Sequence, residues 1–289
     1  MMNIIVNLNK PRDISSHAAV SKVKRLFGAK KAGHAGTLDP VATGVLLVCL
    51  NEATKITGFL STLEKEYRVR LKLGERTDTY DGTGKVVETL NVPQLNEADI
   101  LDILPGFTGE IQQTPPAYSA VKISGKPSYK LARKGLEVIL QPKTVYITSL
   151  ELLGFHSPYI DLHVSCSKGT YIRSICNDIG IALKTGAHMI SLERTRVGDF
   201  RIDASATLQE LEQNKSGIYT IDSALNHMKE LILDENLFRK TRNGVPIEVQ
   251  DSEILLQTDD YIKLKDPTEN IFGIGRFDGR RILIERILN

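Results

Sequence analysis

The chain has 289 residues, of which 41% are hydrophobic and 25% charged, and its net charge is +2. These values are typical of a globular protein with a sizeable core, and the length favours two domains. No apolar run approaches transmembrane length and no signal peptide opens the chain, so we expect a cytoplasmic protein. Its three cysteines are too few and too widely spaced for a disulfide framework or a zinc site, and we expect buried free thiols.

The first elements are a strand and an amphipathic helix. Residues 3–8 are predicted to form a short strand that ends in a turn over residues 10–13. A helix follows, with Ser15 or Ser16 as its cap and Gly28 as its stop. Its apolar positions repeat at helical spacing: Ala19, Val20, Val23, Leu26 and Phe27.

A glycine-rich segment then leads into the most apolar part of the chain. Residues 33–46 contain three glycines, a proline and two threonines, which predicts a tightly folded loop. The apolar run at 45–50 is predicted to be a buried strand. A constrained loop on a rigid strand suits the presentation of one reactive group, and Asp39 is the candidate because Pro40 restricts its backbone. In most glycine-rich loops, however, such an aspartate only accepts backbone hydrogen bonds.

The middle of the chain combines an alternating strand with a polar stretch. Residues 52–60 are predicted to be helical, and residues 65–73 alternate between apolar and polar side chains as a half-buried strand does. Tyr67 begins the inward-facing set, where its ring lines a pocket mouth or joins the core. Residues 74–84 carry acids without the spacing of an EF-hand, so we expect a connecting loop.

The next segment supplies an arginine that needs a partner. Residues 128–134 are predicted to form a short helix, and residues 159–167 a strand. Thr170 is the expected cap of the helix that follows, and Arg173 lies in its first turn. A cation there opposes the helix dipole, so a carboxylate at a loop end is its natural partner. The alternative is an ordinary surface arginine.

The C-terminal part has a different pattern. Residues 188–197 are predicted to form a strand that contains Leu192, and residues 207–213 a short helix. Beyond residue 229 come short apolar segments separated by glycine and aspartate turns, which predicts a small barrel-like module. Those segments are residues 231–233, 247–249, 261–264, 271–275 and 282–286.

Basic residues gather in two stretches of the sequence. Residues 10–31 contain seven bases and one acid, and residues 122–143 contain six bases and one acid. A local excess of positive charge attracts phosphates even where the net charge is small. Solvated helix faces are the alternative. The residues that we expect to contact a phosphate backbone are Lys22, Lys30, Lys31, Lys126, Lys130 and Arg133.

Three segments resemble the motifs of one family. Residues 33–46 closely resemble the catalytic motif of the TruB family, the tRNA pseudouridine-55 synthases. Lys65-Glu66-Tyr67 is similar to the family's Lys-x-Tyr motif, and residues 167–174 resemble the motif whose arginine pairs with the catalytic aspartate. The resemblance spans nearly the whole chain. The chain departs from the family at Asp13, where the family usually has a glycine.

The resemblance implies an α+β fold in two domains. Residues 1–228 would hold a mixed, largely antiparallel central sheet with flanking helices, the pseudouridine synthase fold. Residues 229–289 would form a small PUA-like β domain that binds RNA, and residues from about 118 to 143 an insertion that grips the RNA stem-loop. The implied reaction is isomerisation of uridine 55 in the T loop of tRNA. We expect a monomer that needs no cofactor and no metal.

The resemblance also implies a role for each candidate site residue. Asp39 would be the nucleophile, oriented by Arg173, and Tyr67 would stack on the target base. Tyr171 and Leu192 would shape the pocket, and His34 would take the place that the flipped-out uridine leaves. Attack at C1′ of the ribose and addition to the uracil ring both stay open at this point.

Other functions fit parts of the sequence. A non-catalytic RNA-binding or tRNA-folding protein would explain the basic stretches, but it has no need of a carboxylate facing phosphates. A carboxylate hydrolase of the glycosidase type needs a second carboxylate, and none stands in a motif. Within the family, guide-RNA-dependent archaeal and eukaryotic relatives are a further alternative, and the basic insertion favours the stand-alone bacterial type.

Overall fold

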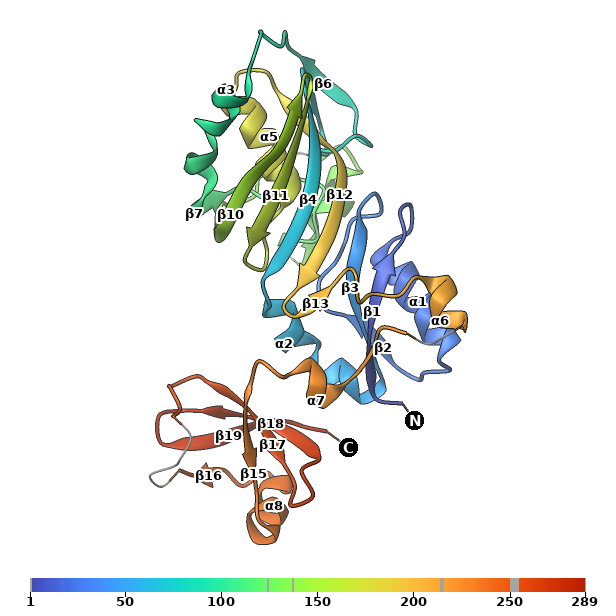
Figure 1. Ribbon diagram of the computed structural model, residues 1–289, viewed down its shortest axis with the longest axis vertical. Helices are drawn as coiled ribbons and strands as arrows, with labels where there is room; N and C mark the ends of the chain where they lie inside the picture. Colours follow the sequence, from blue (N-terminus) through green and yellow to red (C-terminus); the bar gives the residue numbers. More distant parts are fainter. Residues whose placement is uncertain (1, 124, 137, 214–215, 250–254, 289) are drawn as a thin grey trace.

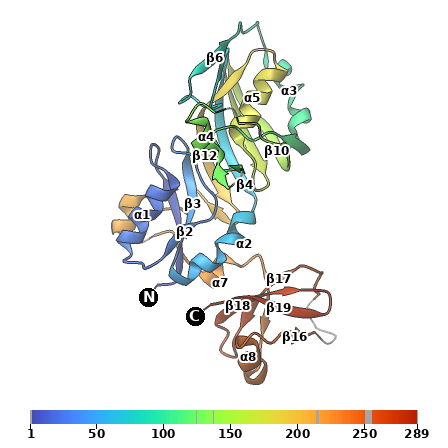
Figure 2. The same ribbon diagram turned by 180° about the vertical axis from the view of Figure 1, so that it is seen from behind.

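The protein is an elongated α+β molecule with a large sheet and, at one end, a smaller one (Figures 1 and 2). The computed structural model describes residues 2–123, 125–136, 138–213, 216–249 and 255–288. The large sheet has the strand order β14-β1-β3-β12-β4-β11-β10-β7, with β2 and β13 pairing beside it. Among its named strands, only β3 and β12 pair in parallel. The predicted mixed, largely antiparallel sheet is confirmed.

The elements of the larger domain are spread along residues 4–224. The strands of its sheet are β1 (Ile4–Lys10), β2 (Ala32–His34), β3 (Thr43–Leu50), β4 (Lys65–Leu73), β7 (Gly109–Gln113), β10 (Lys143–His156), β11 (Tyr159–Cys166), β12 (Ala187–Val197), β13 (Phe200–Arg201) and β14 (Ile218–Thr220). The helices are α1 (Ser16–Leu26), η1 (Asn51–Ile56), α2 (Thr57–Thr62), α3 (Glu97–Leu101), η2 (Leu104–Phe107), α5 (Ile172–Ala182), α6 (Leu208–Gln213) and α7 (Ile221–Ala224). Two hairpins project from the sheet: β5 (Glu75–Thr77) with β6 (Val86–Thr89), and β8 (Lys122–Ile123) with β9 (Lys126–Pro127), which α4 (Ser128–Ala132) follows.

The start of the chain folds as its local signals predict. Ser15 caps α1, because its hydroxyl accepts a hydrogen bond from the backbone N–H of Ala18 at 3.1 Å. Gly28 follows the helix with a φ of 58°. Asp13 has a φ of 66°, the left-handed conformation that glycine adopts most readily, and this accounts for the glycine that the family prefers at this position.

Strand β4 and helix α5 both contribute to the main hydrophobic core. The inward residues of β4 are buried as the alternation predicts, and they share one hydrophobic cluster with the apolar side of α5. The helix covers one face of the sheet (Figure 2). The members of this cluster from the two elements are Tyr67, Val69, Leu71, Leu73, Ile172, Ile175, Cys176 and Ile179.

The three cysteines are free and buried, as predicted. Burial raises the pKa of Cys49 to about 12 and that of Cys166 to about 11. Burial raises the pKa of Cys176 as well. Thiols with such pKa values stay protonated at neutral pH, so they serve as small apolar side chains.

Three predicted details are wrong. The loop at 33–46 is shorter, because residues 32–34 form β2 and pair with β3, which itself begins at Thr43. Thr170 does not cap α5; its hydroxyl donates instead to the carbonyl of Ser167 at 3.0 Å, and the helix starts at Ile172. Residues 74–84 are not all loop, since β5 lies within them.

The C-terminal module is a five-stranded sheet with one helix. Its elements are β15 (Lys229–Ile232), α8 (Glu235–Arg242), β16 (Ile247–Glu248), β17 (Tyr261–Lys265), β18 (Ile271–Phe277) and β19 (Arg281–Ile287), in the strand order β15-β17-β18-β19-β16. All five predicted strands are present. Helix α8 was not predicted, because its eight residues hold only two large apolar side chains among mostly charged and polar ones.

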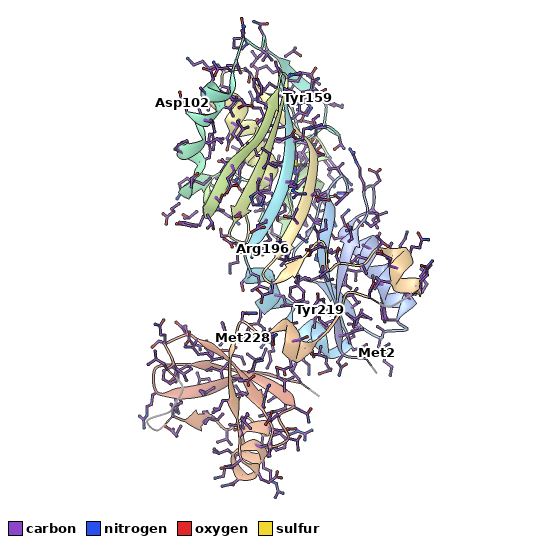
Figure 3. The ribbon with its side chains drawn as sticks, viewed as in Figure 1. Met2, Asp102, Tyr159, Arg196, Tyr219 and Met228 are labelled. Carbon is purple, nitrogen blue, oxygen red and sulfur yellow. The ribbon has the colours of Figure 1, made fainter. Side chains whose placement is uncertain are left out.

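Two kinds of contact fix this module on the larger domain. Ile274 and Leu288 are buried in one cluster with Val45 and Leu47 of β3. Beside it, the ammonium groups of two buried lysines share two carboxylates at 2.8–3.1 Å; the four residues are Lys263, Lys265, Asp222 and Glu230. Figure 3 shows Tyr219 and Met228 near this junction, and both side chains pack against the cluster. The module is therefore docked on the larger domain by a shared core.

Candidate active site

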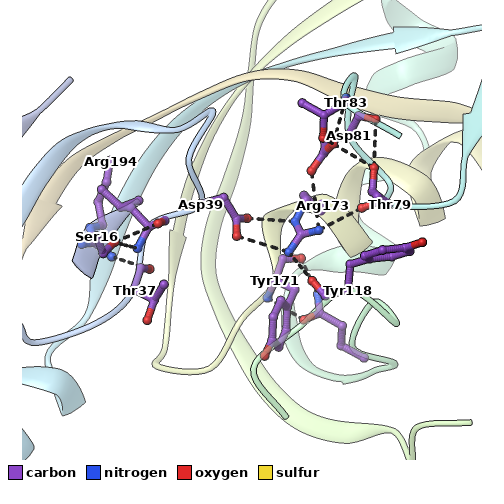
Figure 4. A network of polar contacts seen from close by, with 12 residues as sticks. Ser16, Thr37, Asp39, Thr79, Asp81, Thr83, Tyr118, Tyr171, Arg173 and Arg194 are labelled. Carbon is purple, nitrogen blue, oxygen red and sulfur yellow. Dashed lines mark hydrogen bonds and ion pairs between the residues drawn. The ribbon is translucent and has the colours of Figure 1, made fainter. Parts of the chain in front are cut away.

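Asp39 and Arg173, which lie far apart in the sequence, form an ion pair (Figure 4). The Nε atom of Arg173 lies 2.9 Å from one carboxylate oxygen of Asp39, and its Nη2 donates to the other oxygen at 3.4 Å. The arginine side chain is only 6% exposed, whereas that of Asp39 is 35% exposed. The structure thus brings together the two residues that the sequence paired, with the arginine inside and the carboxylate at the open side.

The remaining donors of Arg173 are also occupied. Its guanidinium donates to the carbonyls of Thr79 and Tyr118, both at 3.0 Å, and its Nη1 lies 3.5 Å from the carboxylate of Asp81. Asp81 is buried, and its Oδ1 accepts bonds from the hydroxyls of Thr79 and Thr83 at 2.8 Å and 2.5 Å. The arginine is therefore held by three separate segments, which leaves it one orientation toward Asp39.

Sequence reasoning missed this part of the site. The sequence predicts a connecting loop at 74–84, yet Thr79 and Asp81 within it face the guanidinium. The segment is placed by β12, because the N–H of Met189 donates to the carbonyl of Tyr80 and the N–H of Gly82 to the carbonyl of Met189. A signal for it was available, because a buried arginine needs more than one hydrogen-bond acceptor, and Asp39 alone does not satisfy all of its donors.

Arg194 supports the loop that carries Asp39. It is 1% exposed and donates to three backbone carbonyls, those of Val45 at 2.7 Å, Gly36 at 3.2 Å and Thr37 at 3.5 Å. Two of these carbonyls belong to the chain entering the loop and one to the strand leaving it. Because β12 pairs with β3 at this point, the arginine joins both limbs of the loop to the central sheet.

Two buried lysines also hold backbone near the site. Lys10 has no exposed surface and donates to the carbonyls of Pro11, Ile14 and Pro40 at 2.8–3.3 Å. Burial lowers the pKa of Lys10 to about 8. The sequence grouped Lys10 with a phosphate-binding stretch, and the structure corrects this, because a buried ammonium group cannot reach an RNA backbone. Lys65 is likewise buried, donates to the carbonyls of Ser61 and Leu63, and has its pKa lowered by burial to about 8.

The expected pocket residues lie on elements that meet at the site. Tyr67 on β4 and Leu192 on β12 are each 7% exposed and sit on directly paired strands. Tyr171 is half-buried just before α5, where its N–H donates to the side chain of Gln113 at 2.7 Å and its carbonyl accepts from the same amide at 3.1 Å. Burial raises the pKa of both tyrosines, so their hydroxyls stay neutral at physiological pH.

His34 stands at the end of β2, at the entry of the Asp39 loop. Its ring is half-buried, and its Nδ1 atom is buried without a hydrogen-bond partner among the described residues. Burial lowers the pKa of His34, and the nearby charges of Arg194 and His17 lower it further. The imidazole is therefore neutral at pH 7.

The candidate RNA-contacting bases are all exposed. Lys22 lies on α1, and Lys30 and Lys31 lie in the turn that leads to β2. On the insertion, Lys126, Lys130 and Arg133 are exposed too, and the guanidinium of Arg133 lies 5.6 Å from the ring centre of Tyr129. Within the described ranges, none of these six residues forms an ion pair with an acid. Their charges are therefore available to a ligand.

The insertion is joined to the site at its base. The carbonyl of Tyr118, its first residue, accepts a hydrogen bond from Arg173. The hydroxyls of Ser119 and Ser128 lie 3.0 Å apart and close the base of the insertion.

No group of three or more His, Cys, Asp or Glu side chains in the described part of the chain is arranged to hold a metal ion. No helix there is long and apolar enough to cross a membrane.

Comparison with known proteins identifies the same family that the sequence motifs resemble. A family model for the N-terminal domain of TruB family pseudouridylate synthases matches residues 24–172, and a model for the C-terminal domain of tRNA pseudouridylate synthase B matches residues 173–234. The border between the two models falls at the start of α5, inside the larger domain.

Relatives of similar length also match most of the chain. The tRNA pseudouridine synthase B of Clostridium tetani is 41% identical over 284 residues, which cover 94% of this chain and 98% of that protein. The protein of the same name from Pelotomaculum thermopropionicum is 46% identical over 254 residues, covering 84% and 80%. Among solved structures, a Cbf5-Nop10-Gar1 complex matches with a TM-score of 0.76 and 25% identity over 98% of this chain and 84% of that one. An H/ACA RNP bound to a substrate RNA that contains 2′-deoxyuridine has the same TM-score at 23% identity, covering 99% and 85%, and shows the same fold.

The close approach of β3 to β12 at Gly44 leads to a first testable prediction. Gly44 has a φ of 97°, and a Cβ atom there would lie 2.2 Å from the backbone oxygen of Arg194. Gly44→Ala should therefore lower the free energy of unfolding by at least about 2 kcal/mol. Gly58→Ala is the matched control, because a Cβ on this helical glycine meets nothing within 4 Å and should raise stability by about 0.5–1 kcal/mol. Urea denaturation followed by circular dichroism measures both, and equal effects would contradict the packing described.

Proposed function

Because the chain belongs to the TruB family of pseudouridylate synthases, we propose that it converts uridine 55 in the T loop of tRNA to pseudouridine, with Asp39 as nucleophile. The chain is a pseudouridine synthase, and the names of its relatives, tRNA pseudouridine synthase B, support tRNA as its substrate. The position in the tRNA and the role of each residue are the content of the proposal.

The observation that carries the proposal is the ion pair between Asp39 and Arg173. The other donors of the guanidinium contact Thr79, Tyr118 and Asp81, so the carboxylate of Asp39 faces a fixed partner. A carboxylate needs no proton removed before it attacks, and what it needs is a fixed orientation. A protein that only binds RNA has no use for this buried arrangement beside its ligand.

The reaction proposed for this site balances without a cofactor. The N1–C1′ bond of the uridine breaks, the uracil turns, and a C5–C1′ bond forms. The proton on C5 leaves to solvent and N1 gains one, so no electrons are gained or lost. Asp39 forms the transient covalent bond to the substrate and is released at the end. Attack at C1′ and addition to the ring both place its carboxylate beside the bond that breaks.

The pocket proposed around Asp39 suits a base removed from its stack. Flipping a nucleotide out costs a few kcal/mol. Stacking on the ring of Tyr67 returns roughly 1–3 kcal/mol of that cost. Tyr171 and Leu192 form the walls. His34, which is neutral at pH 7, fills the vacated place in the loop without the cost of desolvating a charge.

The two basic stretches are proposed to hold the RNA near the site. Apart from Arg12, which lies 3.8 Å from the carboxylate of Asp13, their exposed bases form no ion pair with an acid in the described structure, whereas the C-terminal module neutralises many of its own bases. Lys229, Lys263, Lys265 and Arg276 of the module all pair with carboxylates. More of the phosphate attraction therefore comes from the larger domain, and the PUA-like module adds a second, weaker surface.

Replacing the nucleophile tests the mechanism. Asp39→Asn keeps the size of the side chain and removes its charge, so tRNA should bind nearly as tightly while no product forms. Tritium release from tRNA labelled at uridine C5 measures the reaction directly. Asp161→Asn is the control, because its carboxylate pairs with Arg70 on the sheet at 2.7 Å and should leave release unchanged. Appreciable release by Asp39→Asn would remove Asp39 from the mechanism.

The role of Tyr67 is tested by a pair of substitutions. Phenylalanine keeps the ring, and leucine keeps only the apolar bulk. If the ring stacks on the base, Tyr67→Leu should lose about 1–3 kcal/mol of binding to tRNA, and Tyr67→Phe much less. Filter-binding titrations give both values, with folding checked by circular dichroism. An equal loss in the two variants would assign the role to the hydroxyl instead.

The salt dependence of binding tests the assignment of the bases. Removing one base that neutralises a phosphate should flatten the slope of log affinity against log salt by about 0.7–0.9. The test variant has Lys126, Lys130, Arg133 and Lys134 replaced by glutamine. Four exposed bases of the module provide the matched control: Arg239, Lys240, Arg242 and Arg280. This control is sharper than deletion of the module, because deletion would uncover the core that the two domains share. A larger change of slope in the control would place the main phosphate contacts in the module.

A further inference from the structure

The hydroxyl of Ser16 forms two hydrogen bonds with Leu38, the residue before Asp39. Its oxygen accepts a hydrogen bond from the backbone N–H of Leu38 at 2.8 Å, and its O–H donates to the carbonyl of the same residue, also at 2.8 Å. Ser16 is 2% exposed and Leu38 is 3% exposed, so water does not compete for either bond. One hydroxyl thus fixes both polar groups of the residue that leads into Asp39.

Helix α1 does not need this hydroxyl. Ser16 is the first residue of the helix, but Ser15 supplies the cap by accepting from Ala18. A serine in a first turn usually satisfies its own helix end. Ser16 instead directs its side chain to a loop more than twenty residues further along the chain. Its interaction is therefore one of tertiary structure, and it serves the loop.

The bonds of Ser16 belong to a set that holds the backbone on both sides of Asp39, and Figure 4 shows Ser16, Thr37 and Arg194 of this set. Before Leu38, the carbonyls of Gly36 and Thr37 accept from Arg194. After Asp39, the carbonyl of Pro40 accepts from Lys10 and from the N–H of Asp13. Leu38 is the position nearest to Asp39 on its N-terminal side, and within the described residues Ser16 is the side chain that holds it. Without this hydroxyl, the carbonyl next to Asp39 loses its anchor and becomes free to turn.

We propose that Ser16 is a positioning residue for the isomerisation, acting through the backbone of Leu38 to keep the Asp39 carboxylate at Arg173. This inference rests on the proposed role of Asp39. Ser16 is buried and cannot reach the RNA, so its effect falls on the chemical step and not on tRNA binding. Displacement of a reacting group by about 1 Å costs on the order of a hundredfold in rate, and loss of one anchor among several should cost somewhat less.

The test compares two neighbouring serines in the full-length protein. Ser16→Ala removes the bonds to Leu38, and Ser15→Ala removes the helix cap and touches no residue of the loop. Single-turnover tritium release is measured with enzyme in excess over C5-labelled tRNA, together with the Kd of the complex. Ser16→Ala should react about 10–100-fold more slowly with its Kd within about twofold of the parent value, while Ser15→Ala keeps the parent rate.

Two further variants separate the hydrogen bonds from packing. Ser16→Thr keeps a hydroxyl, and Ser16→Cys keeps the size of the side chain with a much weaker hydrogen-bonding group. The threonine variant should react faster than the cysteine variant. Where Ser16→Ala fails to fold by circular dichroism, this pair decides alone, and equal rates in the two would overturn the proposal.

The outcomes distinguish this inference from the proposed function. A parent-like rate in Ser16→Ala, with Asp39→Asn inactive, overturns the positioning role and leaves the nucleophile in place. An equal slowing in Ser15→Ala assigns the effect to the stability of α1 and also overturns it. A weakened Kd with an unchanged single-turnover rate does the same. Tritium release by Asp39→Asn would contradict the proposed function itself.

Discussion

A buried guanidinium is the group around which the site is built. Removing an arginine from water is costly unless each donor finds an acceptor, and Arg173 finds two carbonyls and two carboxylates. These acceptors come from the Asp39 loop, the segment after β5 and the base of the insertion. The arginine itself is fixed by the first turn of α5. The need to satisfy one buried cation therefore brings four distant segments to one point, and that point is where Asp39 meets the open side of the molecule.

The second constraint is the rigidity of the loop that carries Asp39. A loop of this length gains little order from its own sequence, because most of its backbone groups lack regular partners. Here side chains from β1, α1 and β12 supply them, and all three are buried. Lys10 and Arg194 give their charges to carbonyls instead of carboxylates, so they hold backbone without competing with Arg173 for Asp39. Preorganisation of this kind is what a fixed nucleophile requires.

Local patterns in the sequence predicted what depends on local physics. The alternation in β4, the cap at Ser15 and the stop at Gly28 appear in the structure. The pairing of Arg173 with Asp39 appears too, but it joins distant segments and was predicted from the resemblance of two motifs together with the helix dipole. The predictions that failed concern residues whose surroundings are set by distant parts of the chain. Nothing local distinguishes Lys10 from the exposed lysines near it, because burial is set by strands far away. Asp81 met Arg173 only through the pairing of its loop with β12. Ser16 looked like a second choice of cap, and its true partner lies in another segment.

Arg173 is expected to fix Asp39 through its planar, five-donor guanidinium and not through its charge alone. Arg173→Lys keeps the positive charge but cannot meet four acceptors at once. The direct measurement is the single-turnover rate of this variant with C5-labelled tRNA, alongside its Kd. We expect the rate to fall at least about a hundredfold, as it does when one preorganised donor is removed from an active site, with tRNA binding retained. A rate within about threefold of the parent enzyme, in a variant that is folded and binds tRNA, would contradict the central role of the guanidinium.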